Sequence, residues 1–185
     1  MERSTIFAGF GGQGILFAGN ILARAAMAEG LEVFWIPSYG PEMRGGTASC
    51  TVIVAAEPIG SPVVDRAEAV VALNPPSLAR FEAAVAPGGL LVLNTSLIEA
   101  LPTRTDIEIV AVPCTALART AGDDKLVSVV ALGALLARRP LVPLAAARDA
   151  LEAVLLAKRP EILAADLAAL EAGYAAAMDG ALAPV

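Results

Sequence analysis

Few folds accommodate the pattern at the start of this chain, in which a short apolar run is followed by a glycine-rich turn and a helix-forming segment. The apolar run is Thr5-Ile6-Phe7-Ala8, the turn is Gly9-Phe10-Gly11-Gly12-Gln13-Gly14, and the predicted helix spans residues 15–29. An uninterrupted apolar run is typical of a buried parallel strand, and the first turn of the next helix offers free N–H groups to an anion. The pattern predicts the first strand–turn–helix unit of an α/β protein.

The same region also raises the alternatives of a membrane span or a secretory signal, because residues 4–23 carry no charge. Glycines within it, together with Gln13 and Asn20, would leave backbone polar groups unsatisfied in lipid. The two cysteines, Cys50 and Cys114, do not suggest a secreted disulfide scaffold. We therefore expect no membrane span and a cytoplasmic protein.

The rest of the chain alternates between strand-like and helix-like segments. Strands are predicted at residues 32–36, 47–55, 68–73, 90–93 and 107–112, and helices at residues 77–85, 114–120, 125–138, 144–156 and 161–178. Such alternation favours a single α/β domain over residues 1–185 with a largely parallel sheet and helices on both faces. Its last third is rich in helix.

Composition excludes several classes of function. The chain has no histidine and a net charge of −6, from 13 basic and 19 acidic residues. A chain with this charge lacks the basic surface that nucleic acids require, and without histidine it has no histidine-based triad or histidine-ligated metal. Two cysteines cannot supply the four thiolates of an iron–sulfur cluster. We assign no catalytic and no metal-binding residue to this chain.

The glycine turn matches the G-x-G-x-x-G pattern of dinucleotide-binding sites, and two interpretations of it remain open. A dinucleotide site also needs an acidic residue at the end of the second strand, where this chain has Phe34-Trp35-Ile36-Pro37. The other interpretation is a tight turn that packs the helix on the strand and binds no ligand.

A second polar segment follows the second predicted strand. Pro37 and Pro41 stiffen it, and Arg44 carries a planar cation suited to phosphate or carboxylate. If the second strand runs parallel to the first, this segment lies beside the glycine turn at the carboxyl edge of the sheet. The alternative is a solvated loop with a Glu42–Arg44 pair. The candidate binding residues are Gly9, Gly11, Gly12, Gln13, Gly14, Ser38, Tyr39, Glu42, Arg44, Gly45 and Gly46.

The two segments together, Gly9-Phe10-Gly11-Gly12-Gln13-Gly14 and Ser38-Tyr39-Gly40-Pro41-Glu42-Met43-Arg44-Gly45-Gly46-Thr47-Ala48, carry a resemblance to a known family. They resemble the gamma subunit of 2-oxoacid:ferredoxin oxidoreductases. The amino-acid sequence of the second segment is most similar to the 2-oxoglutarate and 2-oxoisovalerate branches of that family. The likeness continues through Pro58-Ile59-Gly60-Ser61-Pro62, Asn74, Pro87-Gly88-Gly89 and Asn94-Thr95-Ser96. One departure is Ser128, near a position where the family often has asparagine.

This resemblance implies a Rossmann-like fold and a hetero-oligomer in which the catalytic cofactors lie elsewhere. Alpha and beta subunits, with a delta subunit where one exists, would hold thiamine diphosphate, Mg²⁺ and [4Fe-4S] clusters and pass electrons to ferredoxin. The gamma subunit would bind no cofactor alone and would contribute to assembly and to the coenzyme A side of the active region. The competing hypotheses are a free-standing Rossmann-type nucleotide-dependent oxidoreductase and a structural scaffold.

Overall fold

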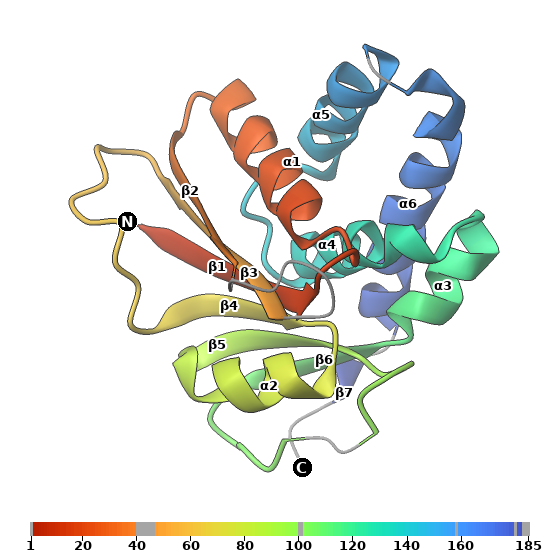
Figure 1. The fold of residues 1–185 in the computed structure, drawn as a ribbon. Coiled ribbons are helices and arrows are strands. Elements are labelled where there is room, and N and C mark those ends of the chain that lie inside the picture. Colours follow the sequence, from red (N-terminus) through yellow and green to blue (C-terminus); the bar gives the residue numbers. More distant parts are fainter. Residues whose placement is uncertain (1, 40–46, 100–101, 158, 180, 183–185) are drawn as a thin grey trace.

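The computed structural model describes residues 2–39, 47–99, 102–157, 159–179 and 181–182. Within these residues one sheet of seven strands has the order β2-β3-β1-β4-β5-β6-β7 (Figure 1). The strands are β1 (Arg3–Phe10), β2 (Glu32–Tyr39), β3 (Thr47–Ala55), β4 (Ala67–Ala72), β5 (Val85–Asn94), β6 (Glu108–Val112) and β7 (Ala181–Leu182). The helices are α1 (Ile15–Ala28), α2 (Pro75–Phe81), α3 (Cys114–Ala121), α4 (Val127–Arg138), α5 (Leu144–Leu156) and α6 (Leu163–Asp179). Three short 3₁₀ turns, η1 (Glu82–Ala84), η2 (Asp124–Leu126) and η3 (Pro160–Ile162), join some of them.

Most of the sheet runs in one direction, as predicted. Strands β1, β4, β5 and β6 pair in parallel, and β2 points the same way because β3 pairs antiparallel with both β1 and β2. The strand β7, which pairs antiparallel with β6, was not predicted from the sequence. The α/β class, the largely parallel sheet and the helix-rich last third are confirmed.

The helices cover the two faces of the sheet unequally. Helices α1 and α3–α6 share one apolar core with alternate residues of the strands, among them Phe7, Val52 and Val92. The side chains that point the other way, such as Ile6 and Leu91, form a smaller core under α2 (Figure 1). None of the helices in the described ranges is long and apolar enough to cross a membrane.

In the larger core, helices α4 and α6 pack closely against each other, and this contact depends on two buried glycines. A Cβ atom added at Gly133 would overlap the carbonyl oxygen of Leu170, and one added at Gly173 would overlap that of Val130. The two backbones therefore touch where these glycines face each other, and this contact fixes how the last helix crosses α4.

Candidate functional site

Both polar segments singled out from the sequence start at the same edge of the sheet. In the strand register, Gly9 of β1 lies opposite Ala48 of β3, and Ala48 lies opposite Tyr39 at the end of β2. The predicted direction of the second strand is therefore confirmed. Ser38 is exposed at this edge, whereas Glu42, Arg44, Gly45 and Gly46 lie outside the described residues.

The glycines of the turn have roles within the turn itself. Gly12 and Gly14 have φ angles of 98° and 76°, which L side chains rarely adopt. Gly9 packs against Gln13, and a Cβ atom added to it would lie 2.7 Å from Gln13 Oε1. Local geometry thus accounts for three of the four glycines in this segment, of which Gly9 and Gly14 belong to the G-x-G-x-x-G pattern. The pattern alone therefore does not decide between a ligand and a structural turn.

Gln13 ties the turn to the neighbouring strand. Its Oε1 accepts hydrogen bonds from the backbone N–H of Phe10 (2.7 Å) and from Nδ2 of Asn74 (3.2 Å). Asn74 in turn accepts a hydrogen bond from the N–H of Ser77 through Oδ1 (2.9 Å) and so caps α2. Gln13, a candidate binding residue, therefore uses its amide oxygen inside the protein.

A second buried amide, Asn94, holds the end of β5. Its Nδ2 donates to the carbonyl oxygen of Leu73 (3.1 Å) and to Thr115 Oγ1 (3.0 Å), and its Oδ1 accepts from the N–H groups of Ser96 (3.3 Å) and Thr115 (3.2 Å). These bonds use the full capacity of a side-chain amide. Asn94 and Asn74 fix the strand ends that surround the glycine turn, a role that could have been suspected because each asparagine directly follows an apolar strand.

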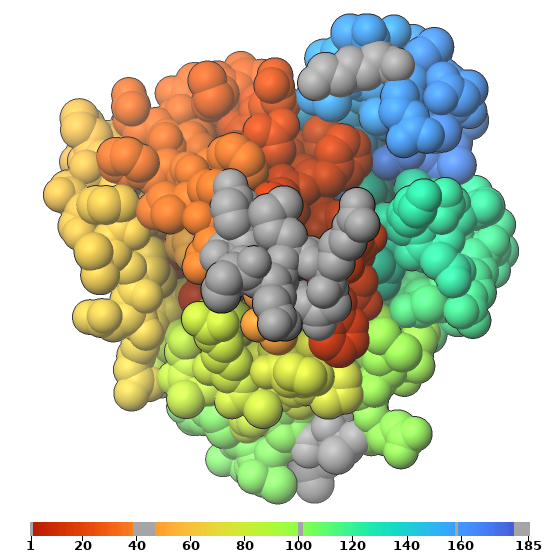
Figure 2. Space-filling view, viewed as in Figure 1, coloured from red at the N-terminus to blue at the C-terminus, as the bar shows by residue number. Residues whose placement is uncertain are grey.

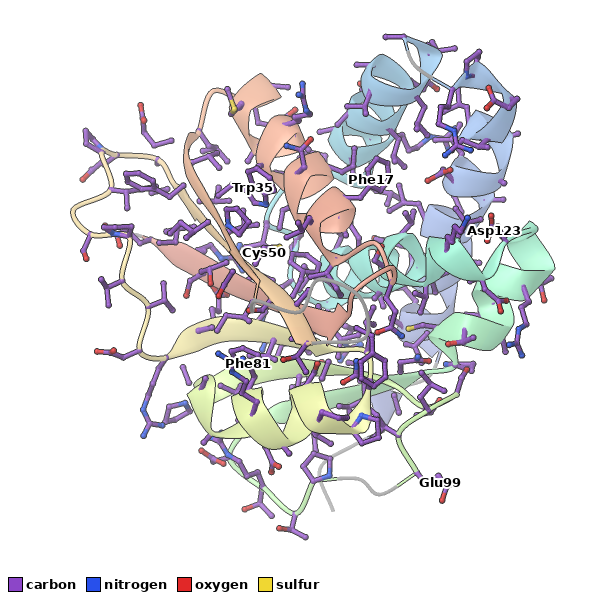
Figure 3. The ribbon with its side chains drawn as sticks, in the orientation of Figure 1. Phe17, Trp35, Cys50, Phe81, Glu99 and Asp123 are labelled. Atoms are coloured by element: carbon purple, nitrogen blue, oxygen red, sulfur yellow. The ribbon has the colours of Figure 1, made fainter. Side chains whose placement is uncertain are left out.

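A cavity of about 700 Å³ lies beside the first turn of α1. Its walls come from the glycine turn, α1, η2, α4, the end of α5, η3 and the start of α6. Its lining includes Gly12, Gly14, Leu16, Phe17, Asn20, Asp123, Lys125, Val129, Leu155, Arg159, Glu161, Ile162 and Asp166. Figure 3 labels Phe17 on the α1 side and Asp123 on the side of α3 and α4. In Figure 2 the red atoms of the first residues and the teal and blue atoms of the last third meet on the side where this cavity lies. Of these walls, the sequence predicted only the glycine turn as part of a site.

Asp166 is the unusual side chain of this cavity. The residue is only 2% exposed, and its Oδ2 has no hydrogen-bond partner among the residues that the structure describes. Burial raises the pKa of this carboxyl to about 6; the nearby Arg159 lowers it and Asp123 raises it further. No local pattern in the sequence distinguishes Asp166 from an ordinary surface acid near the start of a helix.

Ser128, which lies near a position where the family often has asparagine, packs directly behind the turn. It is fully buried, and its Oγ has no hydrogen-bond partner in the described part of the chain. A Cβ atom added at Gly14 would lie 2.5 Å from this Oγ. Ser128 therefore packs against the N-terminus of α1 and is not exposed at the edge of the sheet.

The two cysteines do not fit an iron–sulfur cluster. Cys50 and Cys114 are both buried, and burial raises the pKa of each thiol to about 12, which disfavours the thiolate that a cluster binds. Cys50 Sγ donates to the carbonyl oxygen of Ile15 at 3.4 Å. In the described ranges no group of three or more histidine, cysteine, aspartate or glutamate residues is arranged to hold a metal ion.

The largely parallel sheet and the glycine turn at the carboxyl end of β1 define a Rossmann-like α/β domain. The glycine turn leads directly into the first helix, α1. The family described as pyruvate ferredoxin/flavodoxin oxidoreductase matches residues 4–176, and the chain belongs to this family. The resemblance to gamma subunits of 2-oxoacid:ferredoxin oxidoreductases is confirmed by the relatives that follow.

Three similar proteins represent the family. Ketoisovalerate oxidoreductase subunit VorA of Methanothermobacter thermautotrophicus is 43% identical over 130 residues, which are 70% of this chain and 27% of VorA. The 2-oxoglutarate synthase subunit KorC of Methanocaldococcus jannaschii is 33% identical over 139 residues, covering 73% of this chain and 74% of KorC. The crystal structure of the gamma subunit of a keto/oxoacid ferredoxin oxidoreductase from Geobacter sulfurreducens superposes with a TM-score of 0.86 and 28% identity, over 98% of this chain and 99% of that one. The chain thus spans about a quarter of the VorA proteins that it matches and nearly all of the Geobacter subunit.

Proposed function

We propose that this chain is the gamma subunit of a multi-subunit 2-oxoacid:ferredoxin oxidoreductase, which oxidatively decarboxylates a 2-oxoacid to an acyl-CoA. The observation that carries the proposal is the match to a gamma subunit along almost the whole of both chains. The identity to VorA and KorC favours a 2-oxoisovalerate or 2-oxoglutarate substrate.

The residues of this chain suit a subunit that binds and assembles, with the catalytic cofactors held by its partners. Its two buried cysteines are too few to supply the four thiolates of a cluster, so [4Fe-4S] clusters would be held by other subunits. Thiamine diphosphate with Mg²⁺, bound by the alpha and beta subunits, would supply the electron sink for decarboxylation. The complex would work in the cytoplasm and pass electrons to ferredoxin.

Purification of the native protein with its bound partners tests this proposal. We expect chains that bind thiamine diphosphate and iron–sulfur clusters to co-purify with it, and the complex to reduce ferredoxin only when 2-oxoacid and CoA are present. A complex rebuilt without this chain should lose assembly or acyl-CoA formation. Oxidation of substrate by the lone chain would overturn the proposal in favour of a free-standing oxidoreductase.

Within this function, we propose that the edge formed by the glycine turn and residues 38–46 lies on the CoA side of the active region, with Arg44 binding an anionic group of CoA. The convergence of Gly9, Tyr39 and Ala48 in the strand register supports the proposal, because it brings the start of the second segment to the turn.

Replacing Arg44 with alanine tests the role of its charge. A charge-assisted phosphate contact contributes about 1.5–3 kcal/mol, so R44A should raise the KM for CoA by about tenfold or more in the reconstituted complex. R66A is the matched control, since Arg66 is exposed just before β4, at the opposite edge of the sheet. An unchanged KM with normal assembly would remove Arg44 from this role.

A further inference from the structure

A groove of about 570 Å³ lies beside α2, on the face of the sheet opposite the larger core and α1. Helix α2 and its continuation η1 form one wall, and residues 97–99 and 102–103, which follow β5, form the other. The lining is mostly apolar. Among the described residues that line the groove none is basic, and two are acidic, Glu82 and Glu99.

The wall formed by α2 is a continuous stripe. Pro75, Leu78, Ala79 and Glu82 line the groove at positions i, i+3, i+4 and i+7, the spacing of one face of a helix. At 1.5 Å per residue the stripe is about 10 Å long, which matches about two turns of another helix. On the opposite wall the side chain of Leu97 is 43% exposed, so apolar surface is left facing solvent along the groove.

Hydrogen bonds hold the two walls side by side. Asn94 Nδ2 donates to the carbonyl oxygen of Leu73 just before α2 (3.1 Å), and the carbonyl oxygen of Asn94 accepts from the N–H of Leu97 (3.1 Å). At the other end, Arg104 donates through Nη1 to the carbonyl oxygen of Glu82 (2.9 Å). The groove is therefore formed before anything binds in it, which reduces the entropy lost on binding.

The two carboxylates of the groove lie toward different ends of it. In Figure 3, Phe81, the neighbour of Glu82, is labelled at the left end of α2, and Glu99 is labelled to the right of this helix. Neither Glu82 nor Glu99 forms an ion pair with a residue in the described ranges. The guanidinium of Arg104 is bound to Asp106 (2.8 Å).

This combination of charge and apolar surface selects the kind of partner. An apolar groove between two carboxylates is complementary to an apolar segment with a basic residue at each end. A second copy of the chain is disfavoured, because two molecules with a net charge of −6 repel each other.

We propose that this groove docks a segment of a partner subunit, with apolar side chains against Leu78 and Leu97 and with a lysine or arginine at each end facing Glu82 and Glu99. That the partner is a subunit of the same complex rests on the proposed function. The groove holds one anchoring segment of an interface, because the anchors that contribute most to binding commonly fill such pockets.

Photo-cross-linking in the native complex tests which segment occupies the groove. Benzoylphenylalanine is introduced in place of Leu97 in one chain and of Thr103 in a second, and linked peptides are identified by mass spectrometry. We expect a link to a partner-subunit segment with apolar residues between basic ones. The control position is Val63, which is 73% exposed outside the groove and should not link to that segment.

Removal of the two charges tests how the segment is recognised. E82Q/E99Q should raise the Kd for the purified partner subunits by about tenfold, and this difference should shrink in 1 M salt, where exposed charges are screened. E57Q/D65N removes two exposed carboxylates outside the groove, so it is the matched control and should bind like the unchanged chain. Thermal unfolding of each variant checks that it is folded.

The proposal is overturned if neither groove position links to a partner, if the link is to a second copy or to a segment without basic residues, or if E82Q/E99Q binds like its control. Such a result would leave the proposed function intact as long as thiamine- and cluster-binding subunits still co-purify. Conversely, a link to a basic apolar segment of a protein that binds neither cofactor would support the docking groove and contradict the gamma-subunit proposal.

Discussion

At the scale of single residues, Gly14 is constrained twice, by its own backbone and by a neighbour from a distant part of the chain. Its φ of 76° disfavours any L side chain, and Ser128 Oγ occupies the space that a Cβ would need. We expect G14A to lower the free energy of unfolding by about 2–4 kcal/mol, from backbone strain and steric overlap together. Denaturant unfolding measures this change.

A double-mutant cycle separates the two causes. S128A removes the overlapping oxygen and an unsatisfied buried hydroxyl, so it should restore part of the loss in G14A. The control is G30A, since Gly30 has nearly the same φ of 77° but nothing within 4 Å of its added Cβ. G30A should cost only about 1 kcal/mol. Additive effects of G14A and S128A would contradict the contact.

The sequence predicted that glycines shape this turn, but it could not predict what each glycine does. The G-x-G-x-x-G spacing next to a strand is a local signal, and the turn lies between β1 and α1 as expected, although Gly9 and Phe10, predicted as part of the turn, belong to β1. The contact of Gly14 with Ser128 and the burial of Asp166 arise only when α4 and α6 pack against α1, and no local pattern encodes that packing. The glycine part of the candidate site was therefore predictable, and the charged part of the cavity was not.

At the scale of elements, two glycines set how α4 and α6 cross. Replacing one of them with alanine would stabilise an isolated helix, but we expect it to destabilise the folded protein. Alanine in place of Gly133 raises helix propensity by about 1 kcal/mol, but its Cβ would overlap the backbone of α6 at Leu170. Backbone atoms of a packed helix cannot move aside as a side chain can. We expect G133A to lower the free energy of unfolding by about 3 kcal/mol or more, measured by denaturant unfolding.

The control for the helix-propensity part of this effect is A175G, at an exposed position of the partner helix α6. It should cost about 1 kcal/mol, the ordinary difference in helix propensity. If G133A were as stable as the unchanged chain, the two backbones would not touch as the structure has them.

Helices and strands were predictable because each has its own periodicity, but their pairing was less so. The segment that forms β3 is uncharged and rich in strand-forming residues, so its composition predicts a strand and gives no direction. Its antiparallel place between β1 and β2 is a tertiary choice. The strand β7 has only two residues, too few for any periodic signal.

At the scale of the whole molecule, the buried carboxyl of Asp166 should make stability depend on pH in an unusual direction. The ordinary pKa of aspartate is 3.8, and burial raises that of Asp166 to about 6. Between these values the folded chain holds this proton more tightly than the unfolded chain does, so this group lowers the free energy of unfolding as pH rises from 3.8 to 6. The paired carboxyls Glu108, Asp106 and Asp124 act oppositely, because arginines lower their pKa values.

Comparison with D166N isolates the contribution of Asp166 from the others. Near pH 4 the native Asp166 is protonated, so the two chains should be nearly equally stable, whereas near pH 7.5 D166N should be the more stable by about 2 kcal/mol. D149N, at an exposed carboxyl of α5, is the matched control. Denaturant unfolding of the three chains at both pH values measures the differences. A gain in D166N that is the same at both pH values would mean that the buried carboxyl titrates alike in the folded and unfolded chains.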